Sequence, residues 1–386
     1  MTDPVRVLHV VTLHTPTHAF GGPTRVALNL CRGVRERGHE AVLLALGDGF
    51  PPGAPLPRRV DGVPVRLFPA RHVLPRFEVS GITSPALLAR AHAYIRSADL
   101  VHVHLMRDLI TLPFALIALH SGRPLVLQTH GMVDPTEKRV ARLVDVLGMR
   151  RVLRRADAVL HLTERERRET AAVVAPDPIA PAHRLVNGVP ARERRPARDP
   201  GRPPTVLYLA RVQEGKRPQD FVRAMPAVLA RHPGARFVLA GPDTGALPAT
   251  LALADELGVR GSLEVPGGLD GPEVLRRLRA ADVFVLPSVQ DAFSVSVLEA
   301  MSVGTPVVIT ATTGLAPDVA EAGAGRVVAH PGEVAGAVLD LLDPAANERA
   351  SLAAWDLVRR RFTLDAVVGE LLGLYRSLHP GDDRAR

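Results

Sequence analysis

The sequence contains few cysteine, aromatic and lysine residues. Each shortage limits the kinds of stabilisation, packing or partner that can be expected. The single cysteine, Cys31, excludes an internal disulfide framework and favours a reducing cytoplasm. Aromatic side chains make up 4% of the 386 residues, so valine, leucine and alanine must fill the cores. Lysine stands only at positions 138 and 216, although lysine and arginine together number 48. This arginine excess is typical of a compositional bias. Without aromatic stacking platforms, the formal net charge of +8 does not predict a nucleic-acid partner.

Long apolar runs are also missing. The longest, from Leu109 to Leu119, is interrupted by Thr111 and Pro113 and is well short of the ~20 residues that a membrane-spanning helix needs. The first residues carry an acid, Asp3, and lead directly into an apolar strand pattern, so no signal peptide is expected. We therefore expect a cytoplasmic protein, and we leave open a peripheral contact with the inner face of the membrane.

Short apolar strand patterns alternate with longer helical patterns along the chain, which predicts an α/β fold with parallel sheets. Between two series of strands, the segment 187–204 is rich in proline and arginine without periodicity and is typical of an interdomain linker. We expect Rossmann-like domains at 1–186 and 205–350, and C-terminal helices at 351–386 that pack back towards the first domain. Strands are expected at 6–12, 41–46, 63–69, 100–104, 124–129 and 158–162, then at 205–210, 236–240, 262–265, 283–286, 306–309 and 325–328.

Two carboxylates with seven residues between them stand in "DAFSVSVLEAMSVGTPVV", 291–308, a stretch of mostly small and aliphatic residues. The preceding strand pattern places Asp291 in a loop, and a helix is expected to begin near Ser294 or Ser296 and to end at Gly304. Glu299 then lies in the early turns of a helix whose free N-terminal N–H groups suit a phosphate. The acids could bind hydroxyls on either side of that phosphate. Alternatively, they are a loop acid and an early-helix acid favoured by the helix dipole.

Two basic residues follow an earlier strand in "VLYLARVQEGKRPQDF", 206–221. Arg211 and Lys216 bracket the loop at the carboxyl end of that strand, where ligands bind in open α/β sheets, and Pro218 is placed to begin the next helix. An arginine fork and a lysine point charge suit a diphosphate. Two solvated basic residues are the alternative, but the scarcity of lysine in this chain favours a function for Lys216.

In their order along the chain, the motifs resemble those of the retaining glycosyltransferases of family 4 (glycosyl transferases group 1). These enzymes have the GT-B architecture, in which two Rossmann-like parallel-sheet domains face each other across a cleft. The resemblance spans nearly the whole chain. The segments that carry it are "GGPTRVALNLCRGVRERGHE" (21–40), "DLVHVHL" (99–105), "LQTHGM" (127–132), "HLTERERR" (161–168), "NGVP" (187–190), "LARVQEGKRP" (209–218), "GPD" (241–243) and the two-acid motif of 291–308.

The resemblance implies that 1–186 binds the acceptor and that 205–350 binds a nucleotide-diphosphate sugar as donor. Arg211 and Lys216 would hold the diphosphate, Asp291 would face hydroxyls of the donor sugar, and His130 would lie near the transferred sugar. Glu299 would bind the ribose hydroxyls. The remaining donor-binding residues would be Gly21, Gly22, Gly241, Gly267, Phe293 and Ser294.

The implied reaction transfers the sugar to an acceptor hydroxyl with retention of anomeric configuration, and the departing phosphate helps to deprotonate the acceptor. Because no Asp-x-Asp sequence is present, we expect neither a metal ion nor another cofactor. The acceptor could be a glycan, a lipid-linked sugar or a small molecule. Family members usually carry Glu at 291 and Gly at 292 and 294, where this chain has Asp291, Ala292 and Ser294. A GT-B sugar-nucleotide epimerase and a binding or activating subunit with a decayed site are therefore kept as alternatives.

The segment 136–155 combines seven basic residues with an apolar stripe. Such a helix could lie on an anionic membrane as a peripheral contact, or it could pack on the core and present an arginine-rich solvated face. The stripe consists of Val140, Leu143, Val144, Leu147 and Leu153.

Two histidines, His102 and His104, alternate on one face of an expected strand and could chelate a metal. Without a third ligand at a suggestive spacing, we expect a structural or cleft-lining role. Cys31 lies beside Leu28 and Leu30 in a helical pattern and is expected to be buried as a small apolar residue.

Overall fold

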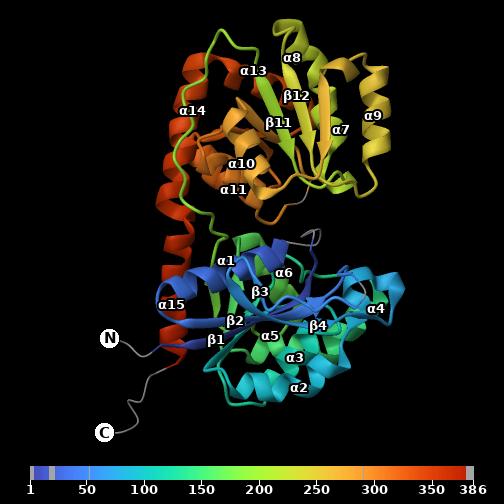
Figure 1. The fold of residues 1–386 in the computed structure, drawn as a ribbon, viewed down its shortest axis with the longest axis vertical. Coiled ribbons are helices and arrows are strands. Elements are labelled where there is room, and N and C mark those ends of the chain that lie inside the picture. The colour runs from blue at the N-terminus through green and yellow to red at the C-terminus, as the bar shows by residue number, and fades with distance from the viewer. Residues whose placement is uncertain (1–3, 17–21, 52, 290, 380–386) are drawn as a thin grey trace. The chain divides into compact units, whose positions relative to one another are not determined.

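The computed structural model describes residues 4–16, 22–51, 53–289 and 291–379 (Figure 1). Contacts divide the chain into two compact units, Met1–Asn187 with Leu364–Arg386, and Gly188–Thr363. Each unit contains one large parallel sheet covered by helices, so the prediction of two Rossmann-like α/β domains is confirmed.

The sheet of the first unit has its switch in strand order between β1 and β7. All its pairings are parallel except that of β3 with β4. In spatial order its strands are β10 (Ala182–Arg184), β9 (Ala158–His161), β8 (Leu125–Gln128), β7 (Leu100–His104), β1 (Arg6–His14), β2 (Glu40–Gly47), β4 (Val63–Pro69) and β3 (Arg59–Val60). The other elements are α1 (Gly22–Glu36), β5 (Arg71–His72), η1 (Pro75–Gly81), β6 (Ile82–Thr83), α2 (Pro85–Arg96), α3 (Thr111–Ala118), α4 (Arg139–Val144), η2 (Asp145–Met149), α5 (Arg150–Arg155), α6 (Glu164–Val174) and α15 (Leu364–Leu378).

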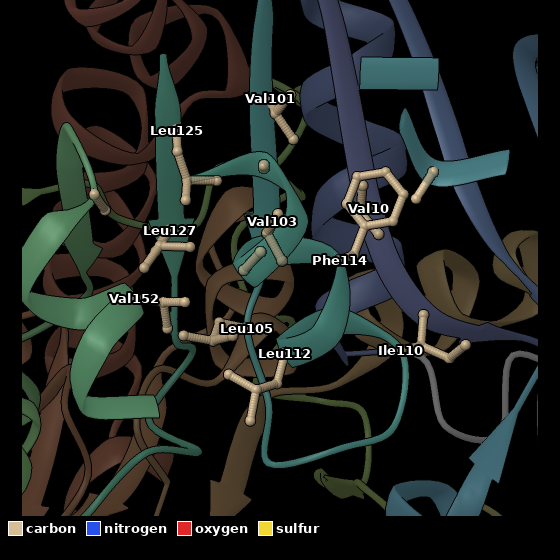
Figure 2. Packing of buried hydrophobic residues seen from close by; sticks show 14 of the residues in the cluster. Val10, Val101, Val103, Leu105, Ile110, Leu112, Phe114, Leu125, Leu127 and Val152 are labelled. Atoms are coloured by element: carbon tan, nitrogen blue, oxygen red, sulfur yellow. The ribbon is translucent and has the colours of Figure 1, made fainter. Parts of the chain in front are cut away.

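The inner strands of this sheet are apolar along their whole length because helices cover both of their faces. In β1, eight of nine residues are buried, and β7, β8 and β9 are buried throughout. Figure 2 shows how Val10, Val103 and Leu127 from three neighbouring strands meet Phe114 of α3 in one cluster. Valine and leucine therefore supply most of this core, as the scarcity of aromatic residues predicts.

The C-terminal segment divides between the two units. Helix α14 (Pro344–Leu357) and the π-helical turn η6 (Val358–Phe362) belong to the second unit, whereas α15 belongs to the first and packs against α1. Arg37, the residue after α1, contacts Asp365 of α15 at 2.5 Å, and Tyr375 of α15 is fully buried. Only α15, therefore, completes the first unit, and the expectation that all of 351–386 packs there is corrected for the part before Leu364.

The sheet of the second unit has the Rossmann strand order, with the switch point between β11 and β14. In spatial order its strands are β13 (Leu263–Gly267), β12 (Arg236–Ala240), β11 (Thr205–Leu209), β14 (Val283–Leu286), β15 (Val307–Thr310) and β16 (Gly325–Val328), all parallel. The other elements are η3 (Glu214–Lys216), α7 (Pro218–Arg223), α8 (Met225–Arg231), α9 (Leu247–Glu256), η4 (Arg260–Ser262), α10 (Gly271–Ala280), α11 (Val295–Ser302), α12 (Ala316–Ala322), η5 (Pro331–Glu333) and α13 (Val334–Leu342).

The proline- and arginine-rich stretch 188–204 is built into the second unit rather than forming a separate linker. Arg195 is 3% exposed and donates to the side chain of Asn347 at 2.6 Å. Arg202 contacts the fully buried Asp282 at 2.8 Å, and Trp355 donates to the carbonyl of Arg192. Arginines of the expected linker are thus held by buried acceptors that lie far away along the chain.

Every expected strand is present, with limits that agree to within two residues. The strands that the sequence did not predict, β3, β5, β6 and β10, are two or three residues long and carry little periodic signal. Cys31 is buried, as expected. Among the described residues, no helix combines the length and the apolar character needed to cross a bilayer.

Candidate functional site

Two of the predicted site residues meet where the loops after β11 and β14 leave the switch point of the second sheet. The Nζ of Lys216, at the end of η3, lies 2.5 Å from Oδ2 of Asp291. The side chains are 18% and 11% exposed, so the ion pair is partly shielded from water. Ligands of open α/β sheets bind at such a switch point.

Backbone contacts fix the two loops against each other. The hydroxyl of Ser288 and the N–H of Val289 both donate to the carbonyl of Gly215 at 3.1 Å. The carbonyl of Asp291 accepts the N–H of Gly314 at 2.9 Å. Hydrogen bonds therefore fix the backbone of the loops that carry the ion pair.

Tyr208 on β11 is a supporting residue that the sequence analysis missed. Its buried ring brings the hydroxyl to the carbonyl of Arg211, to which it donates at 3.2 Å. Burial, together with the charge of Asp291, raises the pKa of this hydroxyl above its ordinary value, so it stays a donor. Its only sequence signal is that tyrosine is rare, with three in the chain.

Arg211 itself is exposed and forms no ion pair within the described part of the chain. It stands in the same loop as Lys216, five positions earlier, while its carbonyl is held by Tyr208. A guanidinium on a fixed backbone and in contact with solvent is available to an anionic ligand.

Helix α11 begins and ends as predicted, after Ser294 and before Gly304. The first intrahelical bond runs from the N–H of Leu298 to the carbonyl of Ser294 at 3.2 Å, so the N–H groups of the first turn have no partner within the helix. Gly304 adopts a φ of +80°, and its N–H and that of Thr305 close the helix on the carbonyls of residues 301 and 300. Glu299 lies in the second turn and is half-buried.

The phenylalanine of the motif has a different place from the one expected. Phe293 is 5% exposed, and its ring lies 5.7 Å from that of Phe362 between centroids, in the core of the second unit. Its side chain is thus a packing residue of this core. Ser294 is also buried, with its hydroxyl 3.2 Å from that of Ser296.

The predicted glycines Gly241 and Gly267 draw the ends of three strands together. Gly241 has a φ of +137°, and a Cβ there would lie 1.9 Å from the carbonyl oxygen of Ala210. Its N–H donates to the carbonyl of Gly267 at 2.8 Å. Only glycine allows this close approach, which places the loop after β12 directly against the residue before Arg211.

The other predicted residues lie in the first unit. Gly22 is the first residue of α1, and Gly21 lies outside the described residues. His130 follows β8 and adopts a φ of +53°, which is unusual for a residue with a side chain. The structure places these residues in a different unit from Arg211 and Lys216.

A buried carboxylate holds the backbone on both sides of His130. Glu166 of α6, 2% exposed, accepts hydrogen bonds from the hydroxyl of Thr129 and from the N–H of Gly131, each at 2.6 Å. Its other oxygen accepts the N–H of Leu162 at 2.7 Å. The loop conformation that carries His130 is therefore imposed by a residue that the sequence analysis did not single out.

His130 is one end of a chain of hydrogen-bonded rings. Its Nε2 lies 2.7 Å from Nδ1 of His104, whose Nε2 lies 3.2 Å from Nδ1 of His9. The hydroxyl of Tyr375 lies 3.4 Å from His9 Nε2 and 2.7 Å from His102 Nδ1. Burial lowers the pKa of His9 and of His130 to about 3, and lowers those of His102 and His104 well below the ordinary value. The rings are therefore neutral at pH 7, and each supplies the single N–H that such a chain needs.

The third histidine that the sequence analysis lacked is His9, which pairs in register with His102 on the neighbouring strand. Ligand atoms of His9, His102 and His104 lie within 4.8 Å of one another. However, the rings of His102 and His104 are parallel to within 7° at a centroid separation of 4.6 Å. Lone pairs in parallel ring planes cannot converge on one ion, so the arrangement favours the hydrogen-bonded chain over a metal centre.

Known protein families match both units of the chain. Residues 21–186 match the family model described as "Glycosyl transferase 4-like domain", and residues 203–344 match "Glycosyl transferases group 1". The D-inositol 3-phosphate glycosyltransferase 2 of Catenulispora acidiphila is 29% identical over 87% of this chain and 85% of its own. The alpha-D-kanosaminyltransferase of Streptomyces kanamyceticus is 27% identical over 75% of this chain and 78% of its own.

The fold is shared with solved GT-B structures. The structure of HepE from Anabaena, in complex with UDP and glucose, superposes with a TM-score of 0.74 at 15% identity, over 97% of this chain and all of that one. The two family models together span most of the sequence, and the strand order of each sheet agrees with the Rossmann-like halves of that fold. The chain belongs to the group 1 glycosyl transferases of family 4 and is a glycosyltransferase with the GT-B fold.

Proposed function

We propose that the chain transfers a sugar from a nucleotide-diphosphate sugar to an acceptor hydroxyl, with retention of anomeric configuration and without a metal ion. The observation that carries the proposal is the pair of Lys216 and Asp291 at the switch point of the second sheet, in loops that also hold the exposed Arg211 and lead into α11. Cationic side chains and unpaired helical N–H groups on one edge of a sheet suit a diphosphate.

The names of the relatives support a sugar donor of this type. One relative is a kanosaminyltransferase, and the structure of HepE contains UDP and glucose. Together with the cationic loop of Arg211 and Lys216, these names favour a nucleoside diphosphate as the leaving group.

In the proposed reaction, the bond between the anomeric carbon and the diphosphate oxygen breaks while the acceptor oxygen attacks from the same face. The acceptor proton passes to the departing phosphate oxygen, so no side chain has to act as the base. Arg211 and Lys216 stabilise the negative charge that develops on the diphosphate, a task that a metal ion performs in other transferases. The absence of an Asp-x-Asp sequence is consistent with this assignment.

The remaining residues would bind the donor. Asp291 would accept hydrogen bonds from hydroxyls of the sugar, and Glu299 from those of the ribose. Backbone groups at Gly241 and Gly267 would line the nucleotide, and those at Gly22 and Gly21 would approach the phosphate. His130 would contact the transferred sugar from its fixed loop.

The first test is a thermal-shift panel of UDP, GDP, ADP and dTDP in buffer containing EDTA. A ligand at 100 times its Kd stabilises the protein by about 2.7 kcal/mol, which raises the unfolding temperature by several degrees. One nucleotide should produce this shift in the wild type and a much smaller one in Lys216→Ala. Slow hydrolysis of the matching sugar donor, followed by NMR, should release first the anomer that the donor carried, whereas release of the opposite anomer would exclude retention.

The panel, together with NMR of the donor, separates the alternatives. An epimerase would convert the donor sugar to its epimer without any acceptor, and NMR of the donor would show this directly. A subunit with a decayed site would bind no nucleotide, and restoring Glu at 291 and Gly at 292 would then be expected to increase binding. We expect neither result, because Lys216 and Asp291 form an ion pair and hydrogen bonds hold their two loops together.

A further inference from the structure

Large apolar side chains that contact solvent are concentrated in one part of the first unit. Of the ten such residues among the described ones, seven lie in two short segments, 73–77 and 140–147. Leu147 is 72% exposed and Val146 66%, so of the two alternatives for the apolar stripe of 136–155, packing on the core does not hold for its first half. The seven residues are Val73, Leu74, Phe77, Val140, Leu143, Val146 and Leu147, and we call them the apolar rim.

The two segments border one groove of about 210 Å³. Leu74 and Phe77 line it from η1 and the residue before it, and Val140, Val144 and Leu147 line it from α4 and η2. Its floor is formed by apolar residues of α3 and the preceding loop, namely Leu109, Leu112, Pro113 and Leu116. The groove is therefore an apolar channel that opens between exposed apolar side chains.

Basic residues surround the rim. Helical spacing of three or four residues places Arg139, Arg142 and Arg150 on the same stripe as Leu143 and Val146, and all five are exposed. These three arginines form no ion pair among the described residues.

The acids of the segment do not offset this charge. Asp145 is buried and turned inward, where it contacts Arg107 at 2.8 Å. Glu137 is the one acid of 136–155 that is exposed in the structure. The stripe therefore combines apolar side chains that contact water with three arginines that form no ion pair among the described residues.

We propose that the apolar rim docks on an anionic lipid bilayer, that a lipid chain enters the groove, and that the acceptor sugar is accordingly carried on a lipid. The statement about the acceptor rests on the proposed function, whereas the docking does not. Exposed leucines and valines bury their surface among acyl chains while neighbouring arginines reach the anionic headgroups. A second copy of this chain fits less well, because it would bring the same positive charges face to face.

Vesicle flotation with the full chain tests the docking. The wild type should bind vesicles that contain phosphatidylglycerol and should bind those of phosphatidylcholine alone far less. Leu143→Gln with Leu147→Gln should weaken binding at least about tenfold, because both side chains are exposed and stop contributing apolar area. Arg139→Gln with Arg142→Gln should weaken binding about thirtyfold at low salt.

Matched controls keep the same chemistry away from the rim. Leu352→Gln removes an equally large exposed leucine, 46% exposed, from the second unit. Arg231→Gln with Arg236→Gln removes the same charge from that unit. Neither control should change the fraction bound, and unchanged unfolding temperatures would show that all variants fold.

Fluorescence tests whether lipid reaches the groove. Phe77 lines it, whereas the single native tryptophan, Trp355, belongs to the second unit. In a Phe77→Trp variant, vesicles with brominated acyl chains should quench the added emission, while the wild-type signal of Trp355 should stay unquenched.

Several results would overturn the inference. Binding that is equal for the rim variants and the wild type, or no binding to anionic vesicles at physiological salt, would do so. A dimer in sedimentation velocity that Leu147→Gln dissociates would assign the rim to a second copy instead. Vesicle binding needs no donor, so its failure is distinct from failure of the proposed function, which would show as absent nucleotide binding in a chain that still docks.

Discussion

The Nζ of Lys216 lies 2.5 Å from the carboxylate of Asp291, so in this structure Asp291 is paired with the cation that we propose binds the diphosphate. The acid is oriented by a braced loop, and the cation stands at the end of a short 3-10 turn. If the proposed function is correct, the diphosphate of the donor and Asp291 share the Lys216 ammonium when the donor binds. Although aspartate has a short side chain, its carboxylate reaches the lysine.

The ion pair gives the first prediction. Lys216→Ala should weaken binding of the nucleoside diphosphate ten- to hundredfold, because a charge-assisted hydrogen bond contributes about 1.5–3 kcal/mol. Asp291→Asn should strengthen binding of the same nucleotide about fivefold, because it removes a competing negative charge, and should lower turnover. Calorimetry with the nucleotide found in the thermal-shift panel measures both effects. Lys138→Ala removes the other lysine and is the control. Weaker nucleotide binding in Asp291→Asn would contradict this account.

The second prediction concerns the loop of His130. Glu166→Gln replaces an acceptor of three hydrogen bonds by an amide whose NH2 group must face one of the donors. We expect a loss of about 2 kcal/mol of stability and faster hydrogen exchange at 129–131. Glu164→Gln, at an exposed position of the same helix, is the matched control. If the exchange at 129–131 is unchanged in Glu166→Gln, the carboxylate does not hold this loop.

The third prediction tests the close approach of two strand ends. In Gly241→Ala the new Cβ would overlap the carbonyl oxygen of Ala210, so the second unit should lose about 2 kcal/mol or more and the nucleotide should bind more weakly. Gly336→Ala in α13 meets no atom within 4 Å and should be neutral or stabilising by up to about 1 kcal/mol. Urea unfolding compares the two variants. Equal stabilities would show that the strand ends separate easily.

The fourth prediction follows from the buried histidines. Their pKa values are lowered on folding, for His9 and His130 from 6.5 to about 3, so between these values the unfolded chain binds protons that the native first unit does not. The free energy of unfolding of that unit should therefore be greatest above pH 6.5. It should fall below that pH by about 1.4 kcal/mol per pH unit for each such histidine.

Hydrogen exchange of β1 and β7 between pH 7 and pH 4.5 measures this slope, after correction for intrinsic rates. His9→Gln should reduce it by one proton. Imidazole signals assigned to His9 or His130 in the native protein that titrate near pH 6.5 would refute the assignment of neutral rings.

The large elements could be predicted because their signals are local. Each inner strand is buried on both faces and reads as an apolar run, and α11 carries its own limits in Ser294 and Gly304. The loops of Lys216 and Asp291 could be placed because the carboxyl ends of parallel strands share one edge.

The parts that the sequence did not reveal depend on contacts between distant residues. His9 joins His104 from the other side of the switch point, and Glu166 acts on a loop 35 positions away. The same holds for Arg195, whose buried partners lie more than a hundred residues further on. The exposure of Leu147 could not be predicted from the sequence either, because an apolar stripe that faces the core and one that faces outward have the same periodicity.

Because α15 supplies Tyr375 and a packing surface for α1, the first unit is discontinuous in sequence, with the whole second unit inserted before its last helix. During synthesis the ribosome releases residues 188–363 before 364–378. The first unit therefore lacks its last helix until the second unit has been synthesised. The second unit, which is continuous, is free to reach its native state first. Order of maturation would then run opposite to order of translation.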